Sequence, residues 1–223
     1  MRGFLVSGLI MTLQGELFSA APPDTLSFEK KARNDGYCYV AGIDEAGRGP
    51  LAGPVMAAAV ILPVGLTIIG VDDSKKLTPD KRDKLFNIIM AQALSVGIGV
   101  MTPAEIDRIN ILQATRRAML AAVLNLSLPP DYLLIDGISA IDSTIPQKTI
   151  ITGDSLSLSI AAASIIAKVT RDREMIAMDA KYPGYGFAGH KGYGSVAHMD
   201  AIKRLGPSPI HRLTFGGVKE HVR

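Results

Sequence analysis

The stretch from Tyr37 to Leu62 constrains the fold more than any other part of the chain, because it holds two apolar segments around a glycine-rich turn. Tyr37–Ile43 and Val55–Leu62 are rich in β-branched and small apolar residues, which predicts two strands. Asp44 and Glu45 follow the first of them directly. Successive side chains of a strand face opposite ways, so both acids reach one site only where the strand ends or bulges. We therefore expect two carboxylates at the end of the first strand.

The turn between the strands suits an anionic ligand. Gly47 and Gly49 flank Arg48, so backbone N–H groups and a guanidinium can approach a phosphate or a sugar without obstruction by a Cβ atom. Acids beside an anion-seeking loop contribute little to stability. A divalent cation between them, with a phosphate on its far side, accounts for both features.

Two other interpretations of this stretch stay open. It also fits a solvated glycine-rich turn, or a dinucleotide-binding pattern G-x-G-x-x-G/A that ends at Ala52, with an aspartate about 20 residues further on at Asp72 or Asp73. The dinucleotide pattern requires a helix to begin at its third position. Here Pro54 is followed by a predicted strand, so a nucleotide-dependent oxidoreductase is the weaker alternative.

The composition is that of one sizeable domain with a full core, since 48% of the 223 residues are hydrophobic. A formal charge of +3 permits nucleic-acid binding without requiring it. The single cysteine, Cys38, is expected to be a small buried residue of the first strand, and it excludes an internal disulfide. No apolar run is long enough to span a membrane. We therefore expect a cytoplasmic protein.

Residues 1–24 imitate a secretory signal in part, because they contain the apolar run Phe4–Met11. Ser7 and Gly8 interrupt that run, however, and polar residues precede the apparent cleavage site. We expect a disordered or loosely docked extension at 1–24, followed by a single domain at 25–223.

Further along the chain, strand and helix patterns alternate. Thr78 and Thr102 each place an N-cap before a proline, which predicts helical structure to about Leu94 and, with a break near Asn110, to Leu126. The other predicted helices are Thr25–Arg33, Leu158–Lys181 and Val196–Leu205, the other predicted strands are Leu66–Val71, Val96–Val100, Tyr132–Ile135 and Lys148–Ile151, and Gly184–Gly194 is predicted as a loop. This order indicates an α/β fold with a mixed sheet that begins as an antiparallel meander.

Aspartates recur at the ends of these apolar strands. Asp44, Asp136 and Asp154 each follow one, and Glu45 lies beside the first. If the strands are neighbours, the converging carboxylates repel each other by on the order of several kcal/mol per pair, unless protons or cations neutralise them. Oxygen-only ligands favour Mg²⁺ or Mn²⁺ over zinc. Taken alone, each aspartate also fits a turn or an N-cap.

Together these motifs resemble the signature of ribonuclease HII, the type 2 ribonucleases H. The likeness runs, in order, through Ala41–Pro54, Asp73–Leu77, Leu133–Gly137, Gly153–Asp154, Ser159–Lys168 and His190–Tyr193. It covers roughly residues 37 to 218. The resemblance implies the ribonuclease H-like fold, with a mixed central β-sheet flanked by helices and an added C-terminal helical region at about 195–223.

The resemblance also implies an activity, which is cleavage of the RNA strand of RNA–DNA hybrids and cleavage 5′ of single ribonucleotides in duplex DNA. Two divalent ions, Mn²⁺ or Mg²⁺, would be held by Asp44, Glu45, Asp136 and Asp154, and the products would carry a 5′-phosphate and a 3′-hydroxyl. The substrate-binding residues that it implies, or that we expect beside them, are Gly47, Arg48, Gly49, Ser74, Lys75 and Tyr193. The enzyme would act as a monomer in ribonucleotide removal and primer processing, in DNA repair and replication; a sliding-clamp partner stays open.

Some residues keep alternative readings. Ser74 and Lys75 also fit a solvated charge run, and Lys168 and Arg171 could face substrate or solvent. His190 and His211 are weak metal candidates, because neither has the spacing of a ligand pair. Two departures from the family pattern are Leu156, where a basic residue is common, and Gly217, where bacterial members commonly have proline. An inactive hybrid-binding module is the non-enzyme alternative, against which the four acids argue.

Overall fold

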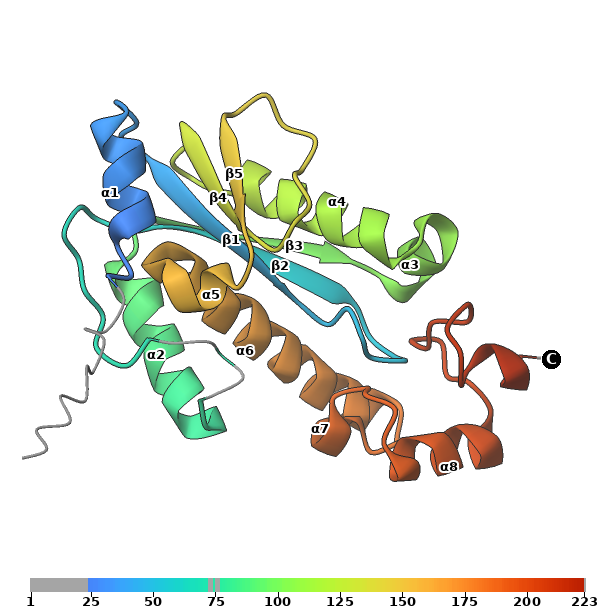
Figure 1. Ribbon diagram of the computed structural model, residues 1–223. Coiled ribbons are helices and arrows are strands. Elements are labelled where there is room, and N and C mark those ends of the chain that lie inside the picture. The colour runs from blue at the N-terminus through green and yellow to red at the C-terminus, as the bar shows by residue number, and fades with distance from the viewer. Residues whose placement is uncertain (1–23, 72–73, 75–76, 223) are drawn as a thin grey trace, which may run out of the picture.

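The computed structural model describes residues 24–71, 74 and 77–222, and a five-stranded mixed sheet forms its centre (Figure 1). Its strands lie in the order β3-β2-β1-β4-β5. They are β1 (Val40–Ala46), β2 (Val55–Ile61), β3 (Ser95–Met101), β4 (Tyr132–Asp136) and β5 (Gln147–Ile150). The first three pair antiparallel, whereas β4 pairs parallel to both β1 and β5. The predicted α/β class with a mixed sheet is confirmed.

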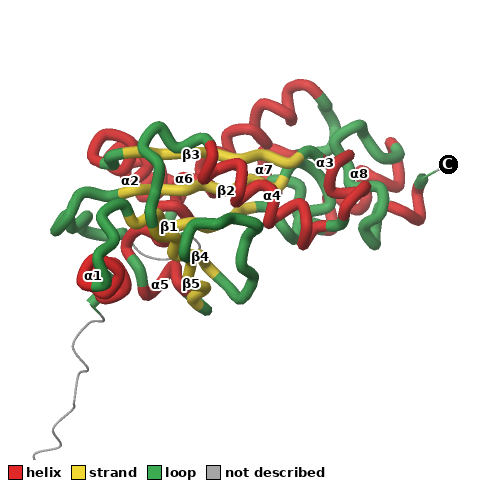
Figure 2. Tube along the Cα trace, turned by 90° about the horizontal axis from the view of Figure 1, so that it is seen from above, coloured by secondary structure: helices red, strands yellow, loops and turns green. Residues whose placement is uncertain are grey.

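Helices cover both faces of this sheet. On one face, α4 (Ile111–Leu124) packs against β2 and β3, and α3 (Pro103–Ile109) leads into it. On the other face, α6 (Leu158–Lys181) runs along β1 and β2, and α2 (Pro79–Gln92) packs against α6. The remaining helices are α1 (Ser27–Asn34), α5 (Gly153–Leu156), α7 (Phe187–His190), α8 (Val196–Leu205) and a 3-10 helix at Lys219–His221. Figures 1 and 2 both place α8 and the C-terminal tail at the opposite end of the molecule from α1.

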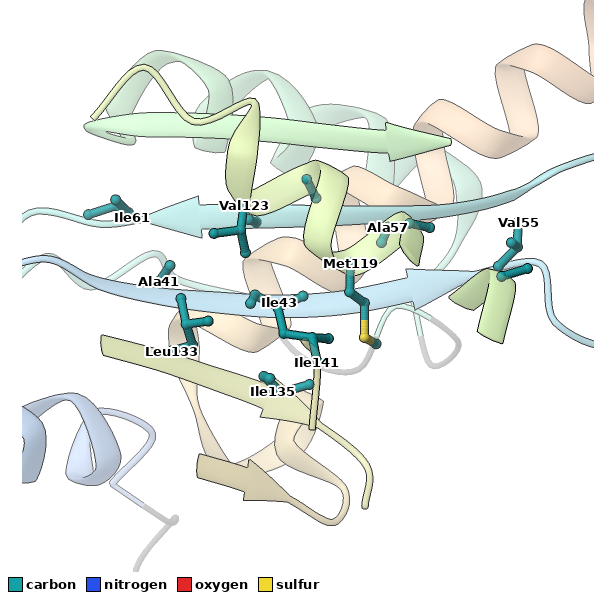
Figure 3. Close-up of a cluster of buried hydrophobic side chains, with 14 of the residues drawn as sticks. Ala41, Ile43, Val55, Ala57, Ile61, Met119, Val123, Leu133, Ile135 and Ile141 are labelled. Carbon is teal, nitrogen blue, oxygen red and sulfur yellow. The ribbon is translucent and has the colours of Figure 1, made fainter. Parts of the chain in front are cut away.

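The core lies in two layers, one on each face of the sheet. Between the sheet and α4, Ile43 and Ile135 of the strands pack with Met119 and Val123 of the helix (Figure 3). On the other face the small residues of α6 let it lie close to the strands. A Cβ atom on Gly42 of β1 would overlap the backbone of α6, so this contact requires glycine.

Helix α1 is joined to the start of α6 by a buried carboxylate. The Oε1 atom of Glu29 accepts hydrogen bonds from the hydroxyls of Ser157 and Ser159, both at 2.6 Å, and from the N–H of Ser159 at 3.0 Å. Ser157 is the N-cap of α6. The partial positive charge of a helix N-terminus favours a carboxylate at this place. Glu29 therefore connects the first helix to the residues that immediately follow α5.

The predicted third strand, Leu66–Val71, is wrong, because this segment is an irregular loop with turns. Strand β2 already pairs with β1 along one edge and with β3 along the other, so it offers no edge to a further strand. The prediction for Cys38 is also wrong. Cys38 is exposed and precedes β1, and its N–H donates to the carboxylate of Asp131.

Three smaller differences concern the predicted site. Strand β1 continues to Ala46, so Asp44 and Glu45 lie within the strand and not after it. Asp154 lies on the short helix α5 and not at the end of a strand. The predicted loop at Gly184–Gly194 contains α7. The break near Asn110 is confirmed, because this residue separates α3 from α4 with a φ of 69°.

Some of the predictions concern residues that the structure does not describe. The extension at 1–24 lies outside them except for Asp24, as do Asp72, Asp73 and Lys75. Among the helices that are described, none is long and apolar enough to cross a membrane.

Candidate active site

Asp44 and Asp136 come from neighbouring parallel strands. The register of β1 and β4 pairs Ile43 with Ile135, so the two aspartates are the next residues along their strands. Asp44 is buried; its Oδ1 accepts the N–H of Glu45 at 2.7 Å, and its side chain is hydrogen-bonded to Ser164 of α6. The strand order thus brings two carboxylates from distant parts of the sequence to one edge of the sheet.

The electrostatics of Asp44 show that the acids influence one another. Burial raises the pKa of Asp44 well above its usual value, and the nearby carboxylates of Glu45 and Asp136 raise that pKa further. A carboxylate in such surroundings is stable in its charged form only beside a compensating cation. This group of acids therefore costs stability, which is typical of a functional site.

Asp154 reaches the same region through a tight turn after β5. Thr152 adopts a left-handed conformation with a φ of 55°, and the next N–H, of Gly153, donates to Oδ1 of Asp136 at 2.7 Å. Asp154 follows Gly153 directly and is buried. The start of α5 therefore places the fourth predicted acid one residue away from a contact with the third.

The donor set fits a hard divalent cation, although the acids do not form a finished cluster. In the described part of the chain, no three His, Cys, Asp or Glu side chains are grouped as metal ligands. Protein groups engage the acids instead, as the ion pair of 3.3 Å between Glu45 and Arg48 shows. All four candidate ligands are carboxylates, however, and the raised pKa of Asp44 marks a site that needs positive charge. Mg²⁺ and Mn²⁺ prefer such oxygen ligands.

The glycine-rich turn forms one wall of a cavity of about 280 Å³. Gly47 has a φ of +96°, and a Cβ atom there would overlap the side chain of Arg171, so only glycine allows this backbone path. The predicted residues that line the cavity are Glu45, Gly47, Arg48, Gly49, Ser74 and Tyr193. Ala46 of β1 and Ser164 and Lys168 of α6 complete the lining. Lys75 lies outside the described residues, and Asp44, Asp136 and Asp154 do not line this cavity.

Two of the lining residues, Ser74 and Tyr193, differ in their exposure to solvent. The hydroxyl of Ser74 is buried and lies 2.8 Å from that of Ser164, the residue that is hydrogen-bonded to Asp44. Tyr193 is half exposed. The centre of its ring lies 5.9 Å from Nζ of Lys168 and 6.0 Å from Cζ of Arg171. Tyr193 is therefore the aromatic face that the cavity offers to a ligand.

Two buried arginines hold the wall of the cavity, and the sequence analysis missed this role. The predicted alternatives for Arg171, substrate or solvent, are both wrong, because the residue is fully buried. Its guanidinium donates to the carbonyls of Ala52, Pro54 and Lys191. Arg171 lies on the same helix face as the buried Ser164 and Ala167, so helical periodicity contained a signal. Arg212, in a proline-bearing tail, gave none.

The weaker candidates take structural positions. Nδ1 of His190 accepts the N–H of Gly192 at 3.1 Å, and Nδ1 of His211 accepts the N–H of Ser208 at 2.8 Å. Leu156 packs against a cluster that contains Ala32 of α1, so its apolar side chain joins α5 to the first helix. Gly217 has a φ of +88°, a conformation that proline cannot adopt.

Comparisons with known proteins agree with this geometry. The profile of the Ribonuclease HII family matches residues 41–218. A ribonuclease HII from Pelobacter propionicus is 67% identical over 209 residues, which cover 94% of this chain and 95% of the relative. The crystal structure of ribonuclease H2 from Pyrococcus horikoshii matches with a TM-score of 0.69 at 30% identity, over 82% of this chain and 96% of that one. A complex of PCNA with RNase HII from Archaeoglobus fulgidus gives a TM-score of 0.69 at 25% identity, over 80% and 95% of the two chains.

Proposed function

This chain belongs to the ribonuclease HII family, and from that premise we propose that it cuts 5′ of single ribonucleotides in duplex DNA as well as within continuous hybrids. The family relation makes it a metal-dependent endoribonuclease that acts on the RNA of RNA–DNA hybrids. One feature supports the finer activity above all: Glu45, the Gly47–Gly49 turn and Tyr193 line a single cavity. A candidate metal ligand therefore lies beside the groups that would read a sugar.

We assign Asp44, Glu45, Asp136 and Asp154 as the ligands of two divalent ions, Mg²⁺ or Mn²⁺. When bound, such ions supply an activated water and neutralise the leaving 3′ oxygen, which gives 5′-phosphate and 3′-hydroxyl ends. Asp44 is the acid whose charge most needs compensation, because it is buried and faces two other carboxylates. Arg48 forms an ion pair of 3.3 Å with Glu45. This ion pair would break when Glu45 binds a metal ion.

Recognition of the ribonucleotide would come from the glycine-rich turn and Tyr193, which line the same cavity as Glu45. The backbone of Gly47, Arg48 and Gly49 can offer donors and acceptors to a 2′-hydroxyl, the group that distinguishes RNA from DNA. The exposed ring of Tyr193 would stack on the neighbouring deoxyribose and so detect the junction. For Ser74 and Lys75 we propose phosphate contacts, with the Ser74 hydroxyl also supporting Asp44 through Ser164.

The cellular setting is part of the same proposal. We place the enzyme in the cytoplasm, as a monomer with one catalytic domain at 25–223, in ribonucleotide removal and primer processing during repair and replication. The single cysteine fits a reducing compartment. A sliding clamp is a candidate partner, because the Archaeoglobus relative was solved in complex with PCNA.

A cleavage assay with two substrates tests the proposal. We expect cutting of a continuous RNA–DNA hybrid and of a DNA duplex with one ribonucleotide, with Mg²⁺ or Mn²⁺ and not with a chelator. End mapping should place the cut 5′ of the ribonucleotide and find a 5′-phosphate. Cleavage of the hybrid alone would refute the finer activity. Binding of both substrates without metal-dependent cleavage would identify an inactive binding module, and stabilisation by a dinucleotide alone would favour the oxidoreductase.

A further inference from the structure

The side chain of Arg212 fills the inside of the glycine-rich turn. Its guanidinium donates to the carbonyls of Gly47, Arg48 and Gly53, at 2.5, 2.8 and 2.9 Å. The backbone of the same segment pairs with the turn, because the N–H of Arg212 donates to the carbonyl of Leu51 at 2.9 Å. Arg212 is fully buried and forms no ion pair within the described residues. Its hydrogen bonds therefore set the path of the turn from Gly47 to Gly53.

The preceding residue, His211, connects to Tyr193 through a second histidine. The N–H of Ser208 donates to Nδ1 of His211 at 2.8 Å, and a backbone N–H can only donate. His211 must then carry its proton on Nε2, which lies 3.0 Å from Nε2 of His198. His198 accepts this bond, so its own proton lies on Nδ1, which donates to the carbonyl of Tyr193 at 2.9 Å. One amide thus fixes both tautomers.

The rings of His198 and His211 must both be neutral. His198 and His211 are buried, and burial lowers the pKa of both, that of His211 to about 4. A proton added to Nε2 of His198 would face the N–H of His211 across 3.0 Å, and one added to Nδ1 of His211 would face the N–H of Ser208 across 2.8 Å. The titratable groups that face the pair are His190 of α7, stacked on His198 with ring centres 4.3 Å apart, and Tyr185, 5.1 Å from His211. A charge on His190 would lower both pKa values further.

The side chains of the adjacent residues His211 and Arg212 point in opposite directions. His211 forms a β-bridge with Ala52 of the turn, and successive side chains of extended backbone alternate in direction. One side chain therefore reaches the carbonyl of Tyr193, through His198, while the next reaches the carbonyls of Gly47 and Arg48. The two elements that would read the substrate are held by neighbouring residues of one short segment.

We propose that Arg212 and His211 are positioning residues that fix the placement of Tyr193 relative to the Gly47–Gly49 turn, and thereby determine selectivity for a single ribonucleotide. This inference rests on the proposed function. A continuous hybrid offers many equivalent phosphodiesters, so the enzyme can still cut one of them when Tyr193 or the turn is displaced. A single ribonucleotide offers only one such bond, and a displacement of the recognising groups by about 1 Å can cost up to about a hundredfold in rate.

The test compares kcat/KM on a single-ribonucleotide duplex with kcat/KM on a continuous hybrid, and takes the ratio. We expect Arg212→Lys and His211→Leu to lower this ratio about tenfold or more. His211→Gln should preserve it, because the glutamine amide can still donate toward His198. Arg204→Lys at an exposed position and His221→Asn at a half-buried one, both near the C-terminus, are the matched controls and should leave the ratio unchanged. Equal losses on both substrates in folded variants would overturn the proposal.

Nitrogen NMR of the wild-type histidines provides a second readout that packing alone would not set. We expect His211 protonated on Nε2 and His198 on Nδ1, both neutral at pH 7. Where the variants fail to fold, the same ratio of kcat/KM values is measured for the wild type as a function of pH. Titration of the catalytic acids affects cleavage of both substrates and so cancels in the ratio. The ratio should fall at the pH where either histidine ring takes up a proton. The opposite tautomers, or a ratio unaffected by ring protonation, would refute the inference, whereas a wild type that never cuts single ribonucleotides would refute the proposed function.

Discussion

Two sides of the site treat buried charge in opposite ways: the acids on one side, called the acidic wall, and the glycine-rich turn with Arg171 and Arg212 on the other, called the reading wall. On the acidic wall, of which only Glu45 lines the cavity, the sheet places Asp44 beside Glu45 and Asp136, and burial and the like charges raise the pKa of Asp44. On the reading wall, Arg171 and Arg212 are buried cations whose guanidiniums donate to backbone carbonyls, although Nη1 of Arg171 has no hydrogen-bond partner. The first arrangement needs a cation from outside, whereas the second takes its hydrogen-bond acceptors from the protein's own backbone. Substitutions on the acidic wall should therefore cost activity, and those on the reading wall should cost stability and selectivity.

The largest effect is expected on the acidic wall. Asp44→Asn should lower cleavage of both substrates by at least about a thousandfold, since a metal site contributes several kcal/mol to the transition state. The variant should melt at the same temperature as the wild type or higher, because a repelled buried charge is removed. Asp200→Asn, at an exposed acid, is the control. Cleavage within severalfold of wild type at saturating Mg²⁺ or Mn²⁺ would contradict the metal assignment.

The next effect should be a loss of stability on the reading wall. Arg212→Ala would leave the carbonyls of Gly47, Arg48 and Gly53 without their donor. At about 1–3 kcal/mol for each unsatisfied buried group, unfolding in urea should show a loss of at least about 3 kcal/mol. A stability equal to that of the wild type would mean that water or another donor replaces the guanidinium, and the contrast between the walls would fail.

A smaller change in rate is expected at the exposed ring of Tyr193. Removing an aromatic that stacks on nucleic acid costs about 1–3 kcal/mol, or roughly one to two decades in rate. Tyr193→Ala should therefore impair cutting at a single ribonucleotide more than cutting within a continuous hybrid, while metal binding measured by calorimetry is unchanged. Equal loss on both substrates, or weaker metal binding, would move Tyr193 from recognition to support of the site.

The smallest effect concerns pH and the histidine pair. The pKa of His211 is about 4 in the folded protein and 6.5 as an ordinary value, so the unfolded chain takes up its proton first as the pH falls. Stability is therefore lost from about pH 6.5 downward, by up to about 2 kcal/mol between pH 7 and pH 5. Urea unfolding at both pH values should show this loss in the wild type and a smaller one in His211→Gln. An equal pH dependence in the two proteins would show that folding does not lower the pKa of His211.

Local chemistry made much of the fold predictable from the sequence. Thr78 caps α2 before a proline, Thr102 and Glu105 form a reciprocal capping box, and α6 and α8 have the predicted bounds. In contrast, Leu66–Val71 has the composition of a strand but finds no free edge on β2, which is a property of the assembled sheet. Short-range signals therefore located the helices well and the extra strand badly.

The site was predictable in the same uneven way. The acids and the glycine turn lie in compact motifs, but Arg212 reaches acceptors 159 and 165 residues away in the sequence. No spacing rule connects such positions, and an arginine in a polar tail is usually exposed. His198 was missed for a different reason, since its role depends on a tautomer that Ser208, in the loop after α8, sets through His211.

The attachment of α1 through Glu29 has a consequence for where this enzyme can be shortened. The family profile begins at residue 41, yet the first helix ends before it and supplies the carboxylate that holds Ser157 and Ser159. A polypeptide that started at residue 40 would retain every assigned acid but would lose this anchor next to α5. Hydrogen exchange should then speed up first in the opening turn of α6, and Asp154 would sit on a loosened support. The boundary of the family profile is therefore not the boundary of the folding unit.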